Sequence, residues 1–223
     1  MLFRHSLFLE MAALLTWNSA PARPTVLGVV AEANRVHVNS GAVSEGATAY
    51  DGDCFSTETG GMLLLRVEAA MVELDEESVV TVRSKANGGQ GTEAELGQGT
   101  VVFSAARAAA LEIVAREARI RPTTDARTVA QVSITGPKEL RINARRGALQ
   151  FSYRGVTQTI TEGESYRVIL DPPGDDSKKN EAAQKGAKAS KAFVLVAVGA
   201  AAAAFTAYEA HHHHKRMESP DRP

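Results

Sequence analysis

Glycine recurs at short intervals between residues 25 and 170, and short apolar runs rich in β-branched residues lie between the glycines. In several runs apolar and polar residues alternate, as Val36 and Val38 do with Arg35 and His37. An alternation with a period of two buries one face of a strand and leaves the other in water. Many short strands at this spacing predict an all-β domain over residues 25–170, either a solenoid-like structure or a sandwich.

The clearest passage is the run from Gly147 to Leu170, in which turns at Arg154-Gly155 and Glu162-Gly163 separate three strands. Elsewhere the strands are inferred from short runs rich in β-branched and other apolar residues. The expected strands are 26–31, 35–39, 62–67, 71–74, 79–82, 100–103, 128–134, 139–144, 148–153, 157–160 and 165–170.

The segment Ala105–Ile120 fits two structures. It is rich in alanine, and Leu111, Val114 and Ala118 are spaced as a helical stripe that would end before Pro122. The same segment also places alternate apolar residues on one strand face. Because a β-rich neighbourhood overrides the weak helical preference of alanine, we predict strands here.

Composition and charge exclude several classes of protein. The 223 residues have a formal net charge of −1, so no overall positive charge favours nucleic acid as a partner. Cys54 is the only cysteine, which excludes an internal disulfide and any two-cysteine zinc motif. We interpret Cys54 as a small buried apolar residue rather than a reactive thiol.

Residues 1–22 have the layout of a secretory signal peptide. Arg4 and His5 precede an apolar stretch from Leu7 to Trp17, and Ala20-Pro21-Ala22 forms a small-x-small cleavage pattern. Glu10 is a costly charge within that stretch. The alternative is a cytoplasmic N-terminal segment that is not a signal peptide. We predict export, with the β-domain in the periplasm.

The C-terminal quarter divides into three parts. Residues 171–191 are polar and rich in charge, which predicts a flexible linker. Residues 192–208 lack charge and proline and would be about 26 Å long as a helix, which predicts a single transmembrane helix, with an alanine-rich helix docked on the domain as the alternative. Residues 209–223 form a His-rich basic tail.

The membrane orientation is contested within the sequence itself. Five lysines precede the apolar stretch and only Lys215 and Arg216 closely follow it, so the positive-inside rule favours a cytoplasmic domain. A functional signal peptide requires the opposite. We favour the signal peptide, which leaves the cell envelope as the expected location.

Two acidic motifs have a structural and a chemical interpretation. Asp51-Gly52-Asp53 could offer oxygen ligands to a hard cation, but the residues that follow add only hydroxyls and the isolated Glu58. We predict a tight turn in which Gly52 adopts a positive φ. Asp75-Glu76-Glu77 could supply paired carboxylates for acid–base chemistry, and we predict a solvated loop.

The remaining candidate sites involve histidine and arginine. The four consecutive histidines could bind a transition metal, but a polar tail provides no fixed geometry, and we assign them no metal: His211, His212, His213 and His214. Arginines cluster in the last strands and could form a partner-binding surface: Arg141, Arg145, Arg146 and Arg154. No Walker sequence, nucleophile elbow or His-Glu-x-x-His motif occurs, so we expect neither an enzyme nor a cofactor.

The order of the landmarks resembles that of the FecR-type domain of bacterial envelope proteins. The resemblance extends over VLGVVAEANRVHVNSGAVSEGATAYDGDCFST, VELDEESVVTV, AELGQGTVVFS and RRGALQFSYRGVTQTITEGESYRVIL, within Val26–Leu170. Its landmarks are Gly46, Gly52-Asp53, Ser56-Thr57, Leu74, Ser78, Leu96-Gly97, Gly99, Gly147 and Gly163. The resemblance implies an all-β, solenoid-like or sandwich domain outside the cytoplasmic membrane.

Some proteins with such domains relay surface signals to sigma factors. This chain departs from them, because only about 25 residues precede the β-domain and the apolar stretch follows it. The segment Arg66–Ala70 also departs from the family pattern, because it lacks the usual Gly-Ser turn between strands.

These observations predict a binding or scaffolding module for an envelope protein or polysaccharide. The alternative is a signalling protein whose tail, residues 209–223, contacts a cytoplasmic partner. An open strand edge would also permit a homo-oligomer.

Overall fold

The computed structural model describes residues 24–85, 90–171, 188–189 and 192–198, and all their regular structure is β. No residue in these ranges is helical, which confirms the all-β prediction. The strands are β1 (Val26–Val38), β2 (Gly41–Ala42), β3 (Thr48–Tyr50), β4 (Cys54–Val67), β5 (Ala70–Leu74), β6 (Val79–Ser84), β7 (Thr92–Gln98), β8 (Thr100–Ala105), β9 (Leu111–Ala115), β10 (Ala118–Pro122), β11 (Thr128–Gly136), β12 (Glu139–Arg146), β13 (Leu149–Tyr153), β14 (Val156–Ile160), β15 (Ser165–Leu170), β16 (Lys188–Ala189) and β17 (Phe193–Ala197).

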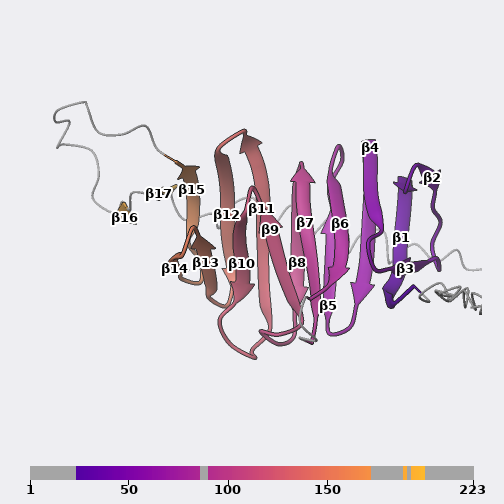
Figure 1. Ribbon diagram of the computed structural model, residues 1–223, viewed down its shortest axis with the longest axis horizontal. Helices are drawn as coiled ribbons and strands as arrows, with labels where there is room; N and C mark the ends of the chain where they lie inside the picture. The colour runs from indigo at the N-terminus through magenta and orange to yellow at the C-terminus, as the bar shows by residue number, and fades with distance from the viewer. Residues whose placement is uncertain (1–23, 86–89, 172–187, 190–191, 199–223) are drawn as a thin grey trace, which may run out of the picture.

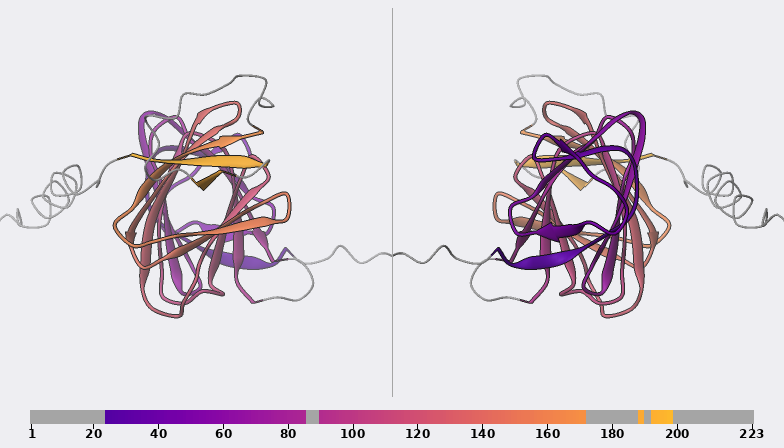
Figure 2. Two further views of the ribbon diagram at one scale, coloured as in Figure 1. Left: turned by 90° about the vertical axis from the view of Figure 1, so that its left-hand side faces the viewer. Right: turned by 90° about the vertical axis from the view of Figure 1, so that its right-hand side faces the viewer.

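One continuous sheet curls into two facing layers. In the first layer β1, β4, β5, β8, β11, β12, β15 and β17 pair in that order. In the second layer β4, β6, β7, β9, β10, β13 and β14 pair in that order. Viewed along the long axis, the layers face each other across the interior (Figure 2).

The long strand β4 belongs to both layers because it bends at Gly60-Gly61. Its first part pairs with β6 and its last part with β5. Gly60 has φ +69, and a Cβ on Gly61 would lie 2.8 Å from the carbonyl oxygens of Arg35 and Glu58. Only glycine tolerates both the left-handed backbone and this close approach. The glycine pair therefore forms the corner between the layers.

Beyond this corner the chain advances along the long axis hairpin by hairpin, alternating between layers (Figure 1). The hairpins β4–β5 and β11–β12 lie in the first layer, and β6–β7, β9–β10 and β13–β14 lie in the second. Because β8 crosses to the first layer, β7 and β9 become direct neighbours and pair in parallel. The fold therefore combines a solenoid-like winding with two packed layers.

The core fills the space between the layers. Four phenylalanines spaced along the chain are almost fully buried: Phe55, Phe103, Phe151 and Phe193. Phe151 of the second layer and Phe193 of the first meet edge to face, with ring centroids 4.8 Å apart. This contact closes the C-terminal end of the core.

Buried hydroxyl groups tie the turns of successive hairpins together. Thr57 Oγ1 accepts a hydrogen bond from Ser78 N at 2.9 Å and donates one to Asp75 O at 2.5 Å. Ser78 Oγ in turn accepts a hydrogen bond from Thr100 N at 2.9 Å. A Cβ on Gly99 would lie 2.3 Å from Ser78 Oγ, so glycine is required where the chain passes this hydroxyl.

Every expected strand is confirmed, although two of them form one strand, one begins earlier than expected, and some observed strands were not expected. Residues 26–31 and 35–39 belong to the single strand β1, and β4 begins at Cys54 rather than at residue 62. The sequence analysis missed β7, whose Ala94 and Leu96 are buried between exposed or half-buried glutamates. The segment 105–120 forms β9 and β10, so the prediction of strands rather than a helix is confirmed.

The expected transmembrane helix over 192–208 is wrong for residues 193–197. These residues form β17, which pairs with β15 and buries Phe193 and Leu195 in the core. Buried Phe193 and Leu195 alternate with half-buried valines, as in a strand, whereas a helix would carry Phe193 and Leu195 to different sides. Residues 199–208 lie outside the described residues. The expected signal peptide, residues 1–22, and the expected tail, residues 209–223, also lie outside them.

The linker expected over 171–191 lies mostly outside the described residues, apart from Asp171 and the short strand β16. Within the described ranges, no helix has the length and apolar character needed to cross a membrane.

Candidate binding surface

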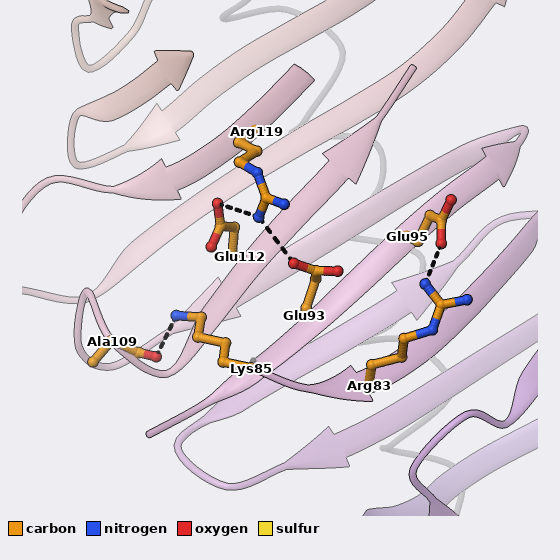
Figure 3. A network of polar contacts seen from close by, with 7 residues as sticks. All are labelled: Arg83, Lys85, Glu93, Glu95, Ala109, Glu112 and Arg119. Carbon is orange, nitrogen blue, oxygen red and sulfur yellow. Dashed lines mark hydrogen bonds and ion pairs between the residues drawn. The ribbon is translucent and has the colours of Figure 1, made fainter. Parts of the chain in front are cut away.

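The outer face of the second layer has an ordered row of opposite charges across β6, β7, β9 and β10. Arg83 Nη1 lies 2.6 Å from Glu95 Oε2. Arg119 Nη1 lies 2.9 Å from Glu93 Oε2 and 3.2 Å from Glu112 Oε1. Figure 3 shows these pairs on neighbouring strands. We call this set the charged row.

The parallel pairing of β7 and β9 explains why Arg119 is needed there. It places Glu93 beside Glu112, and both carboxylates are mostly buried by their neighbours. Two adjacent like charges destabilise a sheet. Arg119 reaches both from β10, and its hydrogen bonds to Glu93 and then Glu112 raise its pKa above the ordinary arginine value. One guanidinium thus bridges two carboxylates, which leaves one net negative charge at this point of the row.

A groove of about 530 Å³ lies beside the charged row. Lys85 follows the end of β6 and Arg121 lies near the end of β10, and the loop before β9 contributes Ala108 and Ala109. The remaining lining residues are Pro122, Thr123 and Gln150. We call this the basic groove, because two cations line it and no carboxylate does.

Hydrogen bonds hold the two cations of the groove in position. Lys85 Nζ donates to Ala109 O at 2.7 Å, as Figure 3 shows. Arg121 Nε donates to Gln150 Oε1 at 2.5 Å. Within the described part of the chain, neither cation forms an ion pair with a carboxylate.

Burial lowers the pKa of Lys85 below the ordinary lysine value, with the nearby charge of Glu112 opposing this effect and that of Arg121 adding to it. A desolvated ammonium favours any anion that restores its lost solvation. The basic groove can therefore hold a carboxylate or another anionic group by charge and hydrogen bonding.

Backbone geometry builds the walls of the groove. Gly91 has φ +107, and a Cβ there would lie 1.9 Å from Ala109 O, so the loop before β9 packs directly on a glycine. Asp125 Oδ1 accepts a hydrogen bond from Ala108 N at 2.9 Å. Thr123 N and Oγ1 both donate to Ala148 O. These contacts fix the loop and the strand end that face each other.

A second group of charges lies on the outer face of the first layer. Glu73 and Asp75 lie on or directly after β5, and Arg145 Nη2 donates to Gln131 Oε1 at 2.7 Å. Burial, followed by the charge of Asp75, raises the pKa of Glu73 to about 7, although Arg145 opposes the shift. Burial also raises the pKa of Asp75. Glu73 therefore titrates near neutral pH.

The structure separates the four arginines expected to form one binding surface. Arg141, Arg145 and Arg146 lie on β12 of the first layer, where Arg141 is exposed opposite Arg167. Arg154 lies in the hairpin turn of the second layer, where its Nη1 pairs with Asp171 Oδ1 at 2.6 Å and its guanidinium lies 5.2 Å from the Tyr153 ring centroid. The four do not form a single cluster.

Asp51-Gly52-Asp53 forms the expected turn, with Gly52 at φ +88. Asp51 Oδ1 accepts a hydrogen bond from Ser84 N at 2.6 Å, and Asp53 Oδ2 accepts one from Tyr50 N at 2.8 Å. Both aspartates therefore bind backbone amides.

The acidic run after β5 is only partly the expected solvated loop. Glu76 and Glu77 are exposed, and Glu76 Oε2 accepts a hydrogen bond from Gly60 N at 2.6 Å. Asp75, which follows β5 directly, is half-buried.

Cys54 is half-buried at the start of β4. In the described ranges no three His, Cys, Asp or Glu residues are placed to hold a metal ion. His211–His214 lie outside the described residues.

The sequence analysis missed Lys85 and Arg121 because they are far apart in the chain and belong to no motif. Lys85 ends a strand and precedes a glycine-rich stretch, and Arg121 precedes a proline at a strand end. A lone cation at a strand end is an ordinary solvent-exposed residue unless its spatial neighbours are known.

No protein-family model matches this sequence, and no curated protein matches it significantly. Among solved structures, two chains described as a "putative anti-sigma factor" from Parabacteroides distasonis ATCC 8503 are similar to this chain, with TM-scores of 0.44 and 0.43 and sequence identities of 13% and 14%. Each alignment covers 52% of this chain and 54% of the other, so about half the length of those proteins is matched. Similarity at this level assigns no function.

Proposed function

We propose that this chain is an extracytoplasmic binding module of FecR type that captures an acidic segment of a partner protein in its basic groove. The observation that supports this function is the placement of Lys85 and Arg121 in one groove whose lining includes no carboxylate. Elsewhere on the same face, Arg83 and Arg119 pair with glutamates. Lys85 and Arg121 form no such ion pair within the described ranges, so both can bind an external anion.

The form of the groove favours an extended peptide segment. It lies along the ends of β6 and β10, and its walls are neutral residues held by backbone hydrogen bonds. Arginine forms planar hydrogen bonds with carboxylates, whereas lysine acts as a point charge. One acidic side chain near each cation, with small or polar residues between them, matches this lining.

The extracytoplasmic location is supported by residues 1–22, which have a charged start, an apolar stretch and a small-x-small end. A fusion of residues 1–30 to alkaline phosphatase, which is active only after export, tests it. We expect activity from the fusion and none when Leu14 and Leu15 are both replaced by arginine. An inactive wild-type fusion in cells that contain the fused protein would contradict export.

Binding is tested with a peptide of eight glutamates as the probe and a peptide of eight glutamines as its control. In nuclear magnetic resonance titrations we expect shifts of the amide signals around Ala108, Ala109 and Thr123 with the glutamate peptide only. Because the cations are partly exposed, we expect Lys85→Gln/Arg121→Gln to weaken binding by about tenfold or more.

The matched control is Arg83→Gln/Arg141→Gln, which removes the same amount of positive charge outside the groove. Equal loss of binding in the two double variants would mean that net charge alone attracts the peptide, and the groove would then have no specific role. Once the probe is validated, a photo-crosslinker at Thr123 in cells identifies the natural partner.

A further inference from the structure

We propose that the chain forms a two-fold dimer in which β14 pairs with β14 of a second copy. β14 ends the second layer: it pairs with β13 on one side, and no described strand pairs with its other side. An open strand edge binds another strand unless it is protected by charge, proline, a bulge or a covering segment. The five residues Val156–Ile160 contain no charge and no proline, and their register with β13 is unbroken.

The backbone of β14 presents two residues to the open edge. Arg154-Gly155 closes a two-residue hairpin, with Tyr153 opposite Val156. The pair that closes such a hairpin is hydrogen-bonded, and hydrogen-bonded pairs alternate with non-hydrogen-bonded ones. The backbone groups of Val156, Gln158 and Ile160 therefore face β13, and those of Thr157 and Thr159 point outward.

The sequence of β14 is nearly palindromic, which identifies a second copy as its partner. In Val-Thr-Gln-Thr-Ile, a threonine lies one residue and a β-branched aliphatic residue two residues on either side of Gln158. In an antiparallel pair centred on Gln158, each Thr157 faces Thr159 of the other copy, and each Val156 faces Ile160. Thr–Thr and β-branched cross-strand pairs stabilise a sheet. The outward backbone groups of Thr157 and Thr159 then form two complete hydrogen-bonded pairs.

The charges that flank β14 are complementary in this register. Arg154 precedes Gln158 by four residues and Glu162 follows it by four, and both side chains are exposed. At each end of the paired strands, Arg154 of one copy therefore lies near Glu162 of the other. Arg154 also pairs with Asp171 of its own chain, which holds its guanidinium at the end of the sheet. Any shift of the register by one residue separates these charges and the matched threonines.

The dimer is tested on the full chain by analytical ultracentrifugation over a range of concentrations. We expect a monomer–dimer equilibrium in the wild type, and for Thr159→Pro a dimer dissociation constant about 30-fold higher, because proline removes one outward N–H from each copy. This N–H makes no bond to β13, so the fold is retained. Thr159→Val, which keeps the N–H and the β-branched shape, is the matched control and should dimerise.

The register is tested by disulfide formation in a Cys54→Ser background. Gln158→Cys places two cysteines opposite each other in a non-hydrogen-bonded pair, within the Cα separation that a disulfide spans. Thr157→Cys is the control, because its two copies lie on opposite sides of the two-fold axis and too far apart. We expect a covalent dimer with Gln158→Cys only.

A wild type that stays monomeric at millimolar concentration would overturn the proposal, as would Thr159→Pro dimerising as well as the wild type. A dimer without the Gln158→Cys disulfide would also overturn it. The peptide titration of the basic groove is unaffected by any of these results, so the two proposals fail independently.

Discussion

At the scale of single residues, Glu73 shows how a sheet surface changes the chemistry of a side chain. It lies on the outer face of β5 between Leu64 and Val102 of the neighbouring strands. Half-burial among apolar neighbours penalises the carboxylate form and raises its pKa to about 7, although Arg145 opposes this effect. The folded chain therefore binds a proton more tightly at Glu73 than the unfolded chain does.

This difference predicts a dependence of stability on pH. The stabilisation by protonated Glu73 is complete below the unfolded pKa of about 4.5 and is lost as the pH rises to about 7. Glu73→Gln, which is neutral at every pH, should be more stable than the wild type at pH 8 by about 1–2 kcal/mol after allowance for solvent screening, and similar to it at pH 4. Urea unfolding at the two pH values measures the difference.

Glu139→Gln provides the control of opposite sign, because hydrogen bonding to Arg167 lowers the pKa of Glu139. This variant should gain no stability at pH 8. A Glu73→Gln variant less stable than the wild type at pH 8 would show that the attraction of Arg145 outweighs the cost of burial.

Ser78 is a second residue whose role depends on its environment. Its side chain is fully buried, and its hydroxyl accepts the backbone N–H of Thr100 at the turn between β7 and β8. Ser78→Ala leaves that buried donor unpaired and should lower the free energy of unfolding by about 1–3 kcal/mol. Ser56→Ala, on the neighbouring strand and only half-buried, is the control and should change it little. Equal effects in urea unfolding would refute the hydroxyl's role.

At the scale of elements, the hairpin β9–β10 has an unfavourable turn. Arg116 and Glu117 have φ values of 50° and 67°, a left-handed conformation that costs each residue about 1–2 kcal/mol relative to glycine or asparagine. The equivalent turn between β13 and β14 uses Arg154-Gly155. The hairpin β9–β10 forms despite its turn because each strand also pairs with a further neighbour, β9 with β7 and β10 with β13.

Replacing this turn by Asn-Gly should stabilise the chain. Arg116→Asn/Glu117→Gly supplies residues that adopt positive φ readily, and we expect the thermal unfolding midpoint to rise, with a gain of about 1–2 kcal/mol. The control, Arg154→Asn, changes a turn that already has glycine and should gain less. A lower midpoint in the double variant would mean that the Arg116 and Glu117 side chains make stabilising contacts.

At the scale of the whole molecule, β17 completes the core of the first layer. Its partner β15 precedes it by more than twenty residues, yet Phe193 is fully buried and meets Phe151 across the layers. The apolar stretch that resembles a membrane segment thus contributes its first part to the folded body. The domain is longer than the residues 25–170 that the strand pattern alone indicates.

Phe193→Ala tests whether β17 belongs to the core in solution. Removing a fully buried aromatic side chain should cost about 3–5 kcal/mol of unfolding free energy. Val194→Ala, on the same strand but half-buried on the outer face, should cost far less. An unchanged unfolding curve for Phe193→Ala would show that residues 193–197 lie outside the folded domain.

The sequence by itself determined the class of structure, because alternation with a period of two and glycine at turns are local properties of a chain. Those properties sufficed for the strands from β5 to β15, apart from β7, whose glutamates and short apolar side chains give a weak pattern. They also sufficed for the turn at Asp51-Gly52-Asp53. The turn at Arg116-Glu117 could not be predicted from the sequence, because neither residue is typical of a left-handed turn.

Only the tertiary structure decided how the strands divide between two layers and which distant side chains meet. Lys85 and Arg121 share a groove because β6 and β10 end on the same side of one layer. The charge of Arg145 acts on Glu73 because β5 and β12 belong to the same layer, with β8 and β11 between them. Phe193–Ala197 forms a strand because the edge of β15 is available to pair with it. A short apolar run can form a helix or a strand, and its tertiary contacts decide which. Each of these outcomes depends on contacts between residues far apart in the chain, about which local periodicity contains no information.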